Sequence, residues 1–350
     1  MGKYIISCLI VLALVVVPVA VMVLPDSVLL ENERRKANTF PSLSAKMIRP
    51  IEIKKWFRGV DAYFADNFPL RHFLIGFALA LHEDSYESSN TNACIRGMEN
   101  WLFLGNNGAK CVDKLQGLIS MSDKALASQA DGFFQKQAKA KELGADFYIL
   151  IGPNKSSIYP EYMPPVIKPS EKRFLTPLVN ALVAGQVKVF DPTELLIKKK
   201  SLGLLYFRTD THWNYLGAYE AYKAFLAHYG MPALPVPTLS EAEPQSGDLV
   251  GMGGYKKFPL STGDNFTLTW NNGDTVTWEN GVATNSQAVM PKSVWVFGDS
   301  FTGGLKPFIA ASFRDVRFFS NDDFDATIRS GLPKPDVILW VHVERNFAGS

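Results

Sequence analysis

The chain has 350 residues, of which 47% are hydrophobic and 20% are charged, and its formal net charge at pH 7 is +2. This composition supplies a buried core and excludes a disordered chain. The one basic run, Lys198–Lys200, follows an apolar helical segment and is typical of a solvated helix C-terminus. Composition and charge therefore give no support to a nucleic-acid-binding protein.

A run of uncharged residues extends from Tyr4 to Leu24. As a helix it would be about 31 Å long at roughly 1.5 Å per residue, which matches the hydrocarbon core of a bilayer. We expect a transmembrane anchor over residues 1–26 and a stalk over 27–50. A cleaved signal peptide is the alternative, although its apolar region is usually about 7–15 residues long and ends in small residues.

Charge and cysteine content give opposite indications of the side of the membrane on which the domain lies. Arg34, Arg35 and Lys36 follow the span, and the positive-inside rule would keep them in the cytoplasm. Large domains, however, translocate largely regardless of loop charge. Cys94 and Cys111 are the only cysteines after the span, and we expect a disulfide between them, which requires an oxidising compartment. Two unpaired core thiols are the alternative.

Beyond residue 50 the chain alternates helical and strand patterns. Apolar residues recur at helical spacing from Ile53 to Phe64 and again after Pro69, and a short strand is expected within 98–105. Further helices are expected at 122–143, 171–184, 193–199, 216–229 and 303–312, and strands at 146–151, 187–190, 293–297 and 337–343. This alternation predicts an α/β domain over residues 51–350, with a mainly parallel sheet covered by helices on both faces.

The composition changes between residues 231 and 291, where proline, glycine and serine cluster. Two segments with alternating polarity, Phe266–Trp270 and Thr275–Trp278, flank Asn271–Asp274. This pattern is typical of a β-hairpin with a glycine-bearing turn. We expect a β-rich insertion above the sheet.

The apolar run from Val294 to Phe297 ends in Gly298, Asp299 and Ser300. Such a pattern is typical of a buried parallel strand that delivers a serine to the carboxyl edge of a sheet, where α/β folds place their chemistry. A serine is a weak nucleophile unless a base and a group that orients the base lie beside it. Candidates for both partners are therefore needed elsewhere in the chain.

The segment Thr209–Asn214 contains both partners. Asp210 and His212 are two residues apart and can lie on one side of an extended segment. The other histidines lie in helical patterns or, like His342, inside an apolar strand. A zinc site on Asp210 and His212 lacks a cysteine or second histidine at ligand spacing. We therefore expect a Ser300–His212–Asp210 nucleophile and no metal.

An ordered set of motifs runs along the chain: Asp66–Arg71, Asn100–Leu104, Gly152–Pro160, Thr209–Asn214, Gly247–Leu249, Gly298–Phe301 and Glu344–Arg345. Taken together, these motifs resemble those of the SGNH hydrolase-like acetyltransferases of the AlgJ/AlgX type. The resemblance implies a flavodoxin-like three-layer sandwich. In ordinary SGNH esterases the serine precedes Asp-x-x-His, whereas here Asp-x-His precedes the serine, which is the permuted order of this group. The chain stops soon after Arg345, without a C-terminal carbohydrate-binding module, so we expect the membrane-anchored AlgJ-like form.

The resemblance also implies an activity, the O-acetylation of an exopolysaccharide such as alginate. The domain would lie in the periplasm on an inner-membrane anchor, would use no cofactor, and would receive acetyl groups through a membrane-bound O-acyltransferase (MBOAT) partner. Ser300 would carry the acetyl group, and His212 would deprotonate Ser300 and then the sugar hydroxyl. A periplasmic carbohydrate acetylesterase and a non-catalytic polysaccharide-binding or assembly protein are the alternatives.

Other site residues are expected around the nucleophile. The Ser300 amide is one candidate donor to the oxyanion, and either Asn154 or Lys155 is a second. Aromatic residues near the serine could form a rim on which sugars stack, or they could belong to the core. The remaining candidates for contact with substrate are Trp213, Phe301, Tyr206 and Arg345.

Overall fold

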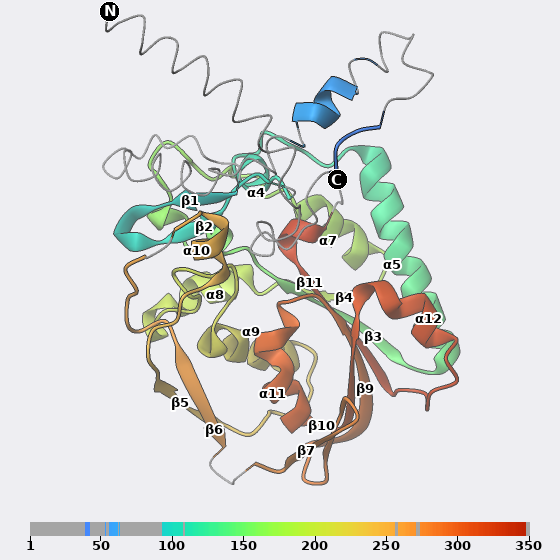
Figure 1. The fold of residues 1–350 in the computed structure, drawn as a ribbon. Helices are drawn as coiled ribbons and strands as arrows, with labels where there is room; N and C mark the ends of the chain where they lie inside the picture. The colour runs from blue at the N-terminus through green and yellow to red at the C-terminus, as the bar shows by residue number, and fades with distance from the viewer. Residues whose placement is uncertain are drawn as a thin grey trace, which may run out of the picture. The chain divides into compact units, whose positions relative to one another are not determined.

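The computed structural model describes residues 39–42, 53, 56–61, 63, 93–107, 109–255, 258–270 and 274–347 (Figure 1). The chain forms two compact units, Met1–Ser85 with Val250–Lys257 and Tyr86–Leu249 with Phe258–Ser350. The predicted anchor, most of the stalk and the predicted helix after Pro69 lie outside the described residues. Within the described part of the chain, no helix combines the length and apolarity needed to cross a membrane.

A seven-stranded sheet forms the centre of the second unit, in the order β4-β3-β11-β9-β10-β8-β7 (Figure 1). In this order, the five strands β4, β3, β11, β9 and β10 run parallel to one another. At the other edge β8 and β7 run antiparallel, so the sheet is mixed. The strands are β3 (Asp146–Gly152), β4 (Lys188–Phe190), β7 (Val276–Glu279), β8 (Val282–Asn285), β9 (Met290–Gly298), β10 (Phe313–Ser320) and β11 (Val337–Val343).

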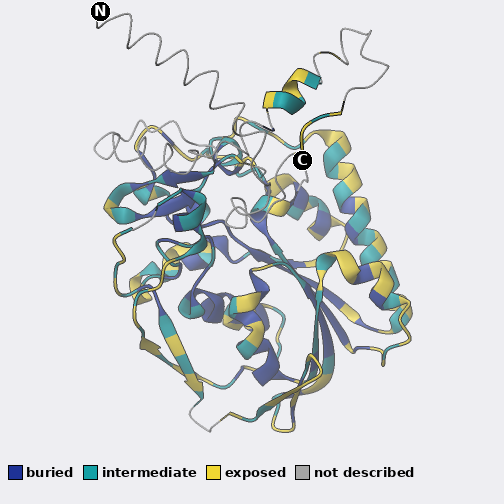
Figure 2. Cartoon of the chain, in the orientation of Figure 1, coloured by how far each residue is buried: buried dark blue, intermediate teal, exposed yellow. Residues whose placement is uncertain are grey.

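Alternate residues of the central strands enter two separate cores, because successive side chains of a strand point to opposite faces. Phe147, Ile149 and Ile151 of β3 pack with α5 and α7, whereas Tyr148 and Leu150 join the core that contains α9 and α11. Both faces are therefore covered, as predicted, and Figure 2 shows the central strands as buried. The helices are α5 (Asp123–Leu143), α7 (Thr176–Ala184), α8 (Thr193–Lys199), α9 (Tyr215–His228), α11 (Thr302–Ser312) and α12 (Phe324–Ile328).

Shorter elements lie around this framework. Strands β1 and β2 pair antiparallel, as do β5 and β6. The short elements of the chain are β1 (Cys94–Arg96), β2 (Leu102–Leu104), α4 (Cys111–Leu115), α6 (Lys155–Ile158), β5 (Pro237–Glu241), α10 (Asp248–Met252) and β6 (Phe266–Trp270), with 3₁₀ turns at 98–100, 160–162, 200–202, 321–323 and 344–346.

The predicted hairpin between Phe266–Trp270 and Thr275–Trp278 is wrong. Strand β6 pairs with β5, whereas β7 pairs with β8 and extends the main sheet instead of lying above it. The turn of the true hairpin is Asn280-Gly281, whose φ angles are 48° and 76°. A two-residue hairpin loop with positive φ at both positions suits the twist of its strands, and Asn-Gly is its preferred sequence.

The predicted disulfide is not formed in the structure. Cys94 and Cys111 are both free and buried. Their charged neighbours differ, because the charge that acts most strongly on Cys94 is Lys155 and that on Cys111 is Arg345. Burial raises the pKa of Cys94 to about 12 and that of Cys111 to about 11. The two thiols therefore behave as inert core groups, which was the alternative interpretation.

Candidate active site

Ser300 lies in the turn between β9 and α11, at the carboxyl edge of the sheet. The turn is tight, because a Cβ at Gly298 would lie 1.8 Å from Thr302 Oγ1. Ser300 is exposed, whereas Phe301 beside it is fully buried. The buried neighbour fixes the turn and the serine hydroxyl stays accessible.

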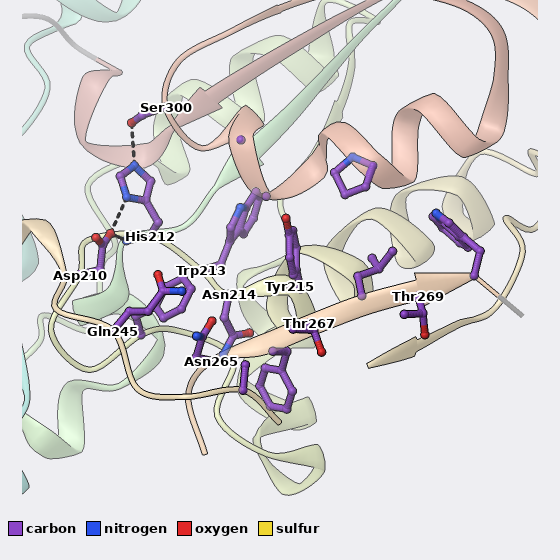
Figure 3. A pocket seen from close by; sticks show the side chains of 18 of the residues that line it. Asp210, His212, Trp213, Asn214, Tyr215, Gln245, Asn265, Thr267, Thr269 and Ser300 are labelled. Atoms are coloured by element: carbon purple, nitrogen blue, oxygen red, sulfur yellow. Dashed lines mark hydrogen bonds and ion pairs between the residues drawn. The ribbon is translucent and has the colours of Figure 1, made fainter. Parts of the chain in front are cut away.

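His212 joins Ser300 to Asp210, as the sequence predicts (Figure 3). His212 Nε2 is 2.7 Å from Ser300 Oγ, and His212 Nδ1 is 2.6 Å from Asp210 Oδ1. The same carboxylate oxygen accepts the His212 amide at 3.0 Å. A carboxylate in this position fixes the imidazole tautomer and leaves Nε2 free to take the serine proton.

The charge of Asp210 is stabilised by its surroundings. Burial alone would raise the pKa of Asp210, but the hydrogen bond and charge of His212 and the amides of Asp248 and His212 hold that pKa below its ordinary value. Asp210 is therefore a carboxylate at neutral pH and can stabilise a protonated His212.

Asp248 supports the Asp210–His212 segment, a role not predicted from the sequence. The Asp248 amide donates to Asp210 Oδ2 at 2.9 Å. The Asp248 carboxylate accepts hydrogen bonds from the amide and the hydroxyl of Thr211, both at 2.8 Å. Asp210, His212 and Asp248 could also reach a common ion. In the structure the imidazole is oriented by its hydrogen bonds to Asp210 and Ser300.

Lys155 is the first residue of α6, and its side chain is bound to the loop that carries Asp210. Its Nζ donates to the carbonyls of Phe207, Arg208 and Asp210 at 3.0, 2.9 and 2.6 Å. These three acceptors use all the protons of an ammonium group. Burial lowers the pKa of Lys155 to about 7, although Asp210 draws it upward. The expected donation from Lys155 to an oxyanion is not supported, because its protons are held by the backbone.

Asn154, Lys155 and Arg345 line one small cavity. The backbone amide of Asn154 donates to Glu344 Oε2 at 2.8 Å. The Arg345 guanidinium lies 5.3 Å from the centre of the Phe301 ring. The contacts expected of the Asn154 and Arg345 side chains with an oxyanion or substrate stay predictions.

The aromatic residues beside Ser300 belong to the core. Trp213 is 2% exposed, and Phe301 and Tyr206 are fully buried. Trp213 Nε1 donates to the Phe301 carbonyl at 3.0 Å, so Trp213 holds the serine turn. This burial favours the core interpretation of Trp213, Phe301 and Tyr206 over the sugar-stacking rim.

Asp299 is a further residue whose role was not predicted from the sequence. Its two carboxylate oxygens accept the amides of Phe301 at 3.0 Å and Val343 at 2.7 Å. Val343 ends β11, the strand beside β9. Asp299 thus ties the serine turn to the neighbouring strand.

A cleft of about 930 Å³ opens beside Ser300 and His212 (Figure 3). Its walls include Gly303, Gly304 and Pro307 of α11 and the whole of β6. Strand β6 therefore forms part of the site, although Phe266–Trp270 was predicted only as one strand of a hairpin above the sheet. The cleft is large enough to bind a substrate that extends well beyond the reacting group.

A family model and a curated relative agree on the family to which the chain is similar. Residues 94–315 match the family model of the SGNH hydrolase-like domain, acetyltransferase AlgX. The chain is 26% identical over 222 residues to the probable alginate O-acetylase AlgJ of Pseudomonas syringae pv. tomato (strain ATCC BAA-871 / DC3000), a match that covers 60% of this chain and 54% of that protein. The chain thus spans about half the length of this curated relative.

Two solved structures have a similar fold. The O-acetyltransferase domain of Pseudomonas putida AlgJ superposes with a TM-score of 0.51 and 16% identity, covering 73% of this chain and 92% of that one. Bacillus cereus PatB1 superposes with a TM-score of 0.52 and 15% identity, covering 74% and 98% of the two chains. At these identities the likeness is one of fold.

Proposed function

Because the chain belongs to the AlgJ/AlgX family of SGNH hydrolase-like O-acetyltransferases, we propose that it takes an acetyl group onto Ser300 and passes it to hydroxyls of an exopolysaccharide. The observation that carries this proposal is the hydrogen-bonded chain of Ser300, His212 and Asp210, with 2.7 Å and 2.6 Å between the paired atoms. A serine held in this way is activated for nucleophilic attack.

The transfer proceeds in two steps. Ser300 Oγ attacks the carbonyl carbon of an acetyl donor while His212 Nε2 takes the serine proton, and the leaving group departs with that proton. A sugar hydroxyl then attacks the acetyl-serine and gives its proton to His212, which returns it to Ser300 as the ester bond to the enzyme breaks. Asp210 stabilises the imidazolium in both steps.

The oxyanion of each step needs donors that are already in place. The Ser300 amide is the proposed donor, and α11, which begins at Thr302, places its N-terminus close to the developing charge. Loss of one such donor typically lowers turnover by about 10²- to 10³-fold.

The location and the donor partner belong to the same proposal. The uncharged run Tyr4–Leu24 supports an inner-membrane anchor, with the catalytic domain in the periplasm and an MBOAT-type protein as acetyl donor. Because Cys94 and Cys111 are free thiols, a disulfide no longer supports an oxidising compartment. The proposed periplasmic location therefore depends on the anchor and on the family.

Incubation with an activated acetyl ester, followed by intact-mass measurement, tests the first step. We expect one added acetyl group on the wild-type chain and none on Ser300→Ala, whereas Ser240→Ala, at an exposed serine of β5, keeps the adduct. Absence of an adduct from the wild-type chain contradicts the proposal.

The exposure of Ser300 favours a second candidate, a carbohydrate acetylesterase, because water can reach the acetyl-serine. The two candidates separate when the acetylated protein is given an oligosaccharide. A transferase yields acetylated sugar, whereas an esterase releases acetate at a rate that the added sugar does not change.

A further inference from the structure

The cleft beside Ser300 is lined, among the described residues, by neutral and acidic side chains together with His212. Among the described residues that line it, none is lysine or arginine, and the carboxylates are Asp210 and Asp274. Asp210 is held by His212, and Asp274 is exposed and accepts the Val276 amide at 3.0 Å. Asp274 therefore gives the described lining a fixed negative charge that a substrate can meet.

Three described cations that are close to lining residues in sequence or by contact have partners outside the cleft. Lys155 Nζ donates hydrogen bonds to three backbone carbonyls. Lys306, which precedes the lining residue Pro307, lies 5.4 Å from the centre of the Phe318 ring. The Arg208 guanidinium lies 6.0 Å from the centre of the Trp101 ring, which is outside the cleft lining.

The lining instead presents neutral polar groups and partly exposed aromatic rings. Gln245, Thr267 and Thr269 are exposed, and their amide and hydroxyl groups can exchange hydrogen bonds with sugar hydroxyls. Tyr215 and Trp270 are half-buried and border the same space. Aromatic rings with a polar end suit a ligand that has both apolar faces and hydroxyl groups.

We propose that this cleft binds an uncharged polysaccharide as the acetyl acceptor and discriminates against a polyuronate such as alginate. The proposal deepens the proposed function and rests on it for the role of acceptor. A uronate carboxylate in the cleft would lose part of its hydration without gaining a cation, and Asp274 would repel it. A neutral sugar has no carboxylate to dehydrate and is not repelled by Asp274.

Oligosaccharide binding to the full-length Ser300→Ala variant tests the preference for neutral sugars, because this variant cannot form the acetyl-serine. Titration with a β-linked gluco-oligosaccharide and with a uronate oligosaccharide of the same length should give at least tenfold tighter binding of the neutral sugar at low salt. The difference should narrow as salt rises, because screening weakens the repulsion from Asp274. Equal or tighter binding of the uronate, or binding of neither, overturns the proposal.

A pair of matched variants localises the effect. Thr269→Lys adds a cation to β6 inside the cleft, whereas Thr277→Lys adds one at an exposed position of β7 outside the lining. We expect uronate affinity to rise at least threefold in the first variant and to stay unchanged in the second. No gain from Thr269→Lys, or an equal gain from Thr277→Lys, contradicts the role of the cleft. Failure of the acetyl adduct to form would overturn the proposed activity and leave this binding preference measurable.

Discussion

Lys155 is hydrogen-bonded to the loop that carries His212, and the free energy cost of burying Lys155 depends on pH. Burial lowers its pKa to about 7, whereas a lysine in the unfolded chain titrates near about 10.4. Between these values the unfolded chain binds more protons, so the unfolding free energy rises with pH. Below about pH 7 both states carry the charge, and the destabilisation caused by its burial is fully present.

We therefore expect the unfolding free energy of the wild-type chain to rise relative to that of Lys155→Met from pH 7 toward pH 10, because the raised pKa values of Cys94 and Cys111 act alike in both proteins. The Met variant also leaves three carbonyls without their donor, which at a fixed alkaline pH should cost about 1–3 kcal/mol. Denaturant unfolding across this pH range measures both effects. The same slope in the two proteins would show that Lys155 titrates normally.

The core of the site was predictable at the level of residues, and its supports were not. Ser300 follows a buried apolar run and Asp210 lies two residues before His212, so local pattern marks all three. Lys155 and Asp248 act through hydrogen bonds to residues 37 to 55 positions away in the chain. Such contacts depend on the tertiary path of the backbone, which no local spacing encodes.

At the scale of elements, the passage from β9 to α11 requires a glycine. A Cβ at Gly298 would overlap Thr302 Oγ1, whereas a Cβ at Gly303, inside α11, would meet nothing within 4 Å. We expect Gly298→Ala to lower the thermal midpoint and the yield of acetyl-serine, because either the serine turn or Thr302 must move.

Gly303→Ala is the matched control. Replacing glycine by alanine inside a helix stabilises it by about 0.5–1 kcal/mol, so its thermal midpoint should stay the same or rise. Thermal unfolding of the two variants side by side decides the point. A Gly298→Ala protein as stable and as readily acetylated as the wild type would mean that the turn can relax.

Strands buried on both faces were predictable, because β3, β9 and β11 read as continuous apolar runs. Strand β10 was missed, since Arg314, Asp315 and Arg317 interrupt its apolar pattern. The hairpin was misplaced because Asn271–Asp274 and Asn280-Gly281 are both turn sequences, and only tertiary pairing distinguishes them. Local pattern thus identified the centre of the sheet and failed at its antiparallel edge.

For the molecule as a whole, the sheet brings distant segments to one place. In the register of the parallel strands, Val341 is paired with Gly298 and Val343 with Gly152. The segments that follow β3 and β9 therefore emerge at a common edge, where Lys155 holds the histidine loop and Asp299 holds the serine turn. This explains how an Asp-x-His motif can precede its serine in the chain and still give the same contacts.

The two thiols test whether this arrangement depends on a covalent link. A disulfide between Cys94 and Cys111 would stabilise the chain by about 3 kcal/mol in the chain-entropy model, and dithiothreitol would then lower the unfolding free energy by that amount. Because both thiols are free, we expect no change with dithiothreitol. Alkylation in denaturant without reductant should label all 3 cysteines of the chain. Protein isolated from cells that is labelled only at Cys8, and at the other two only after reduction, would show that the link forms and that the domain occupies an oxidising compartment.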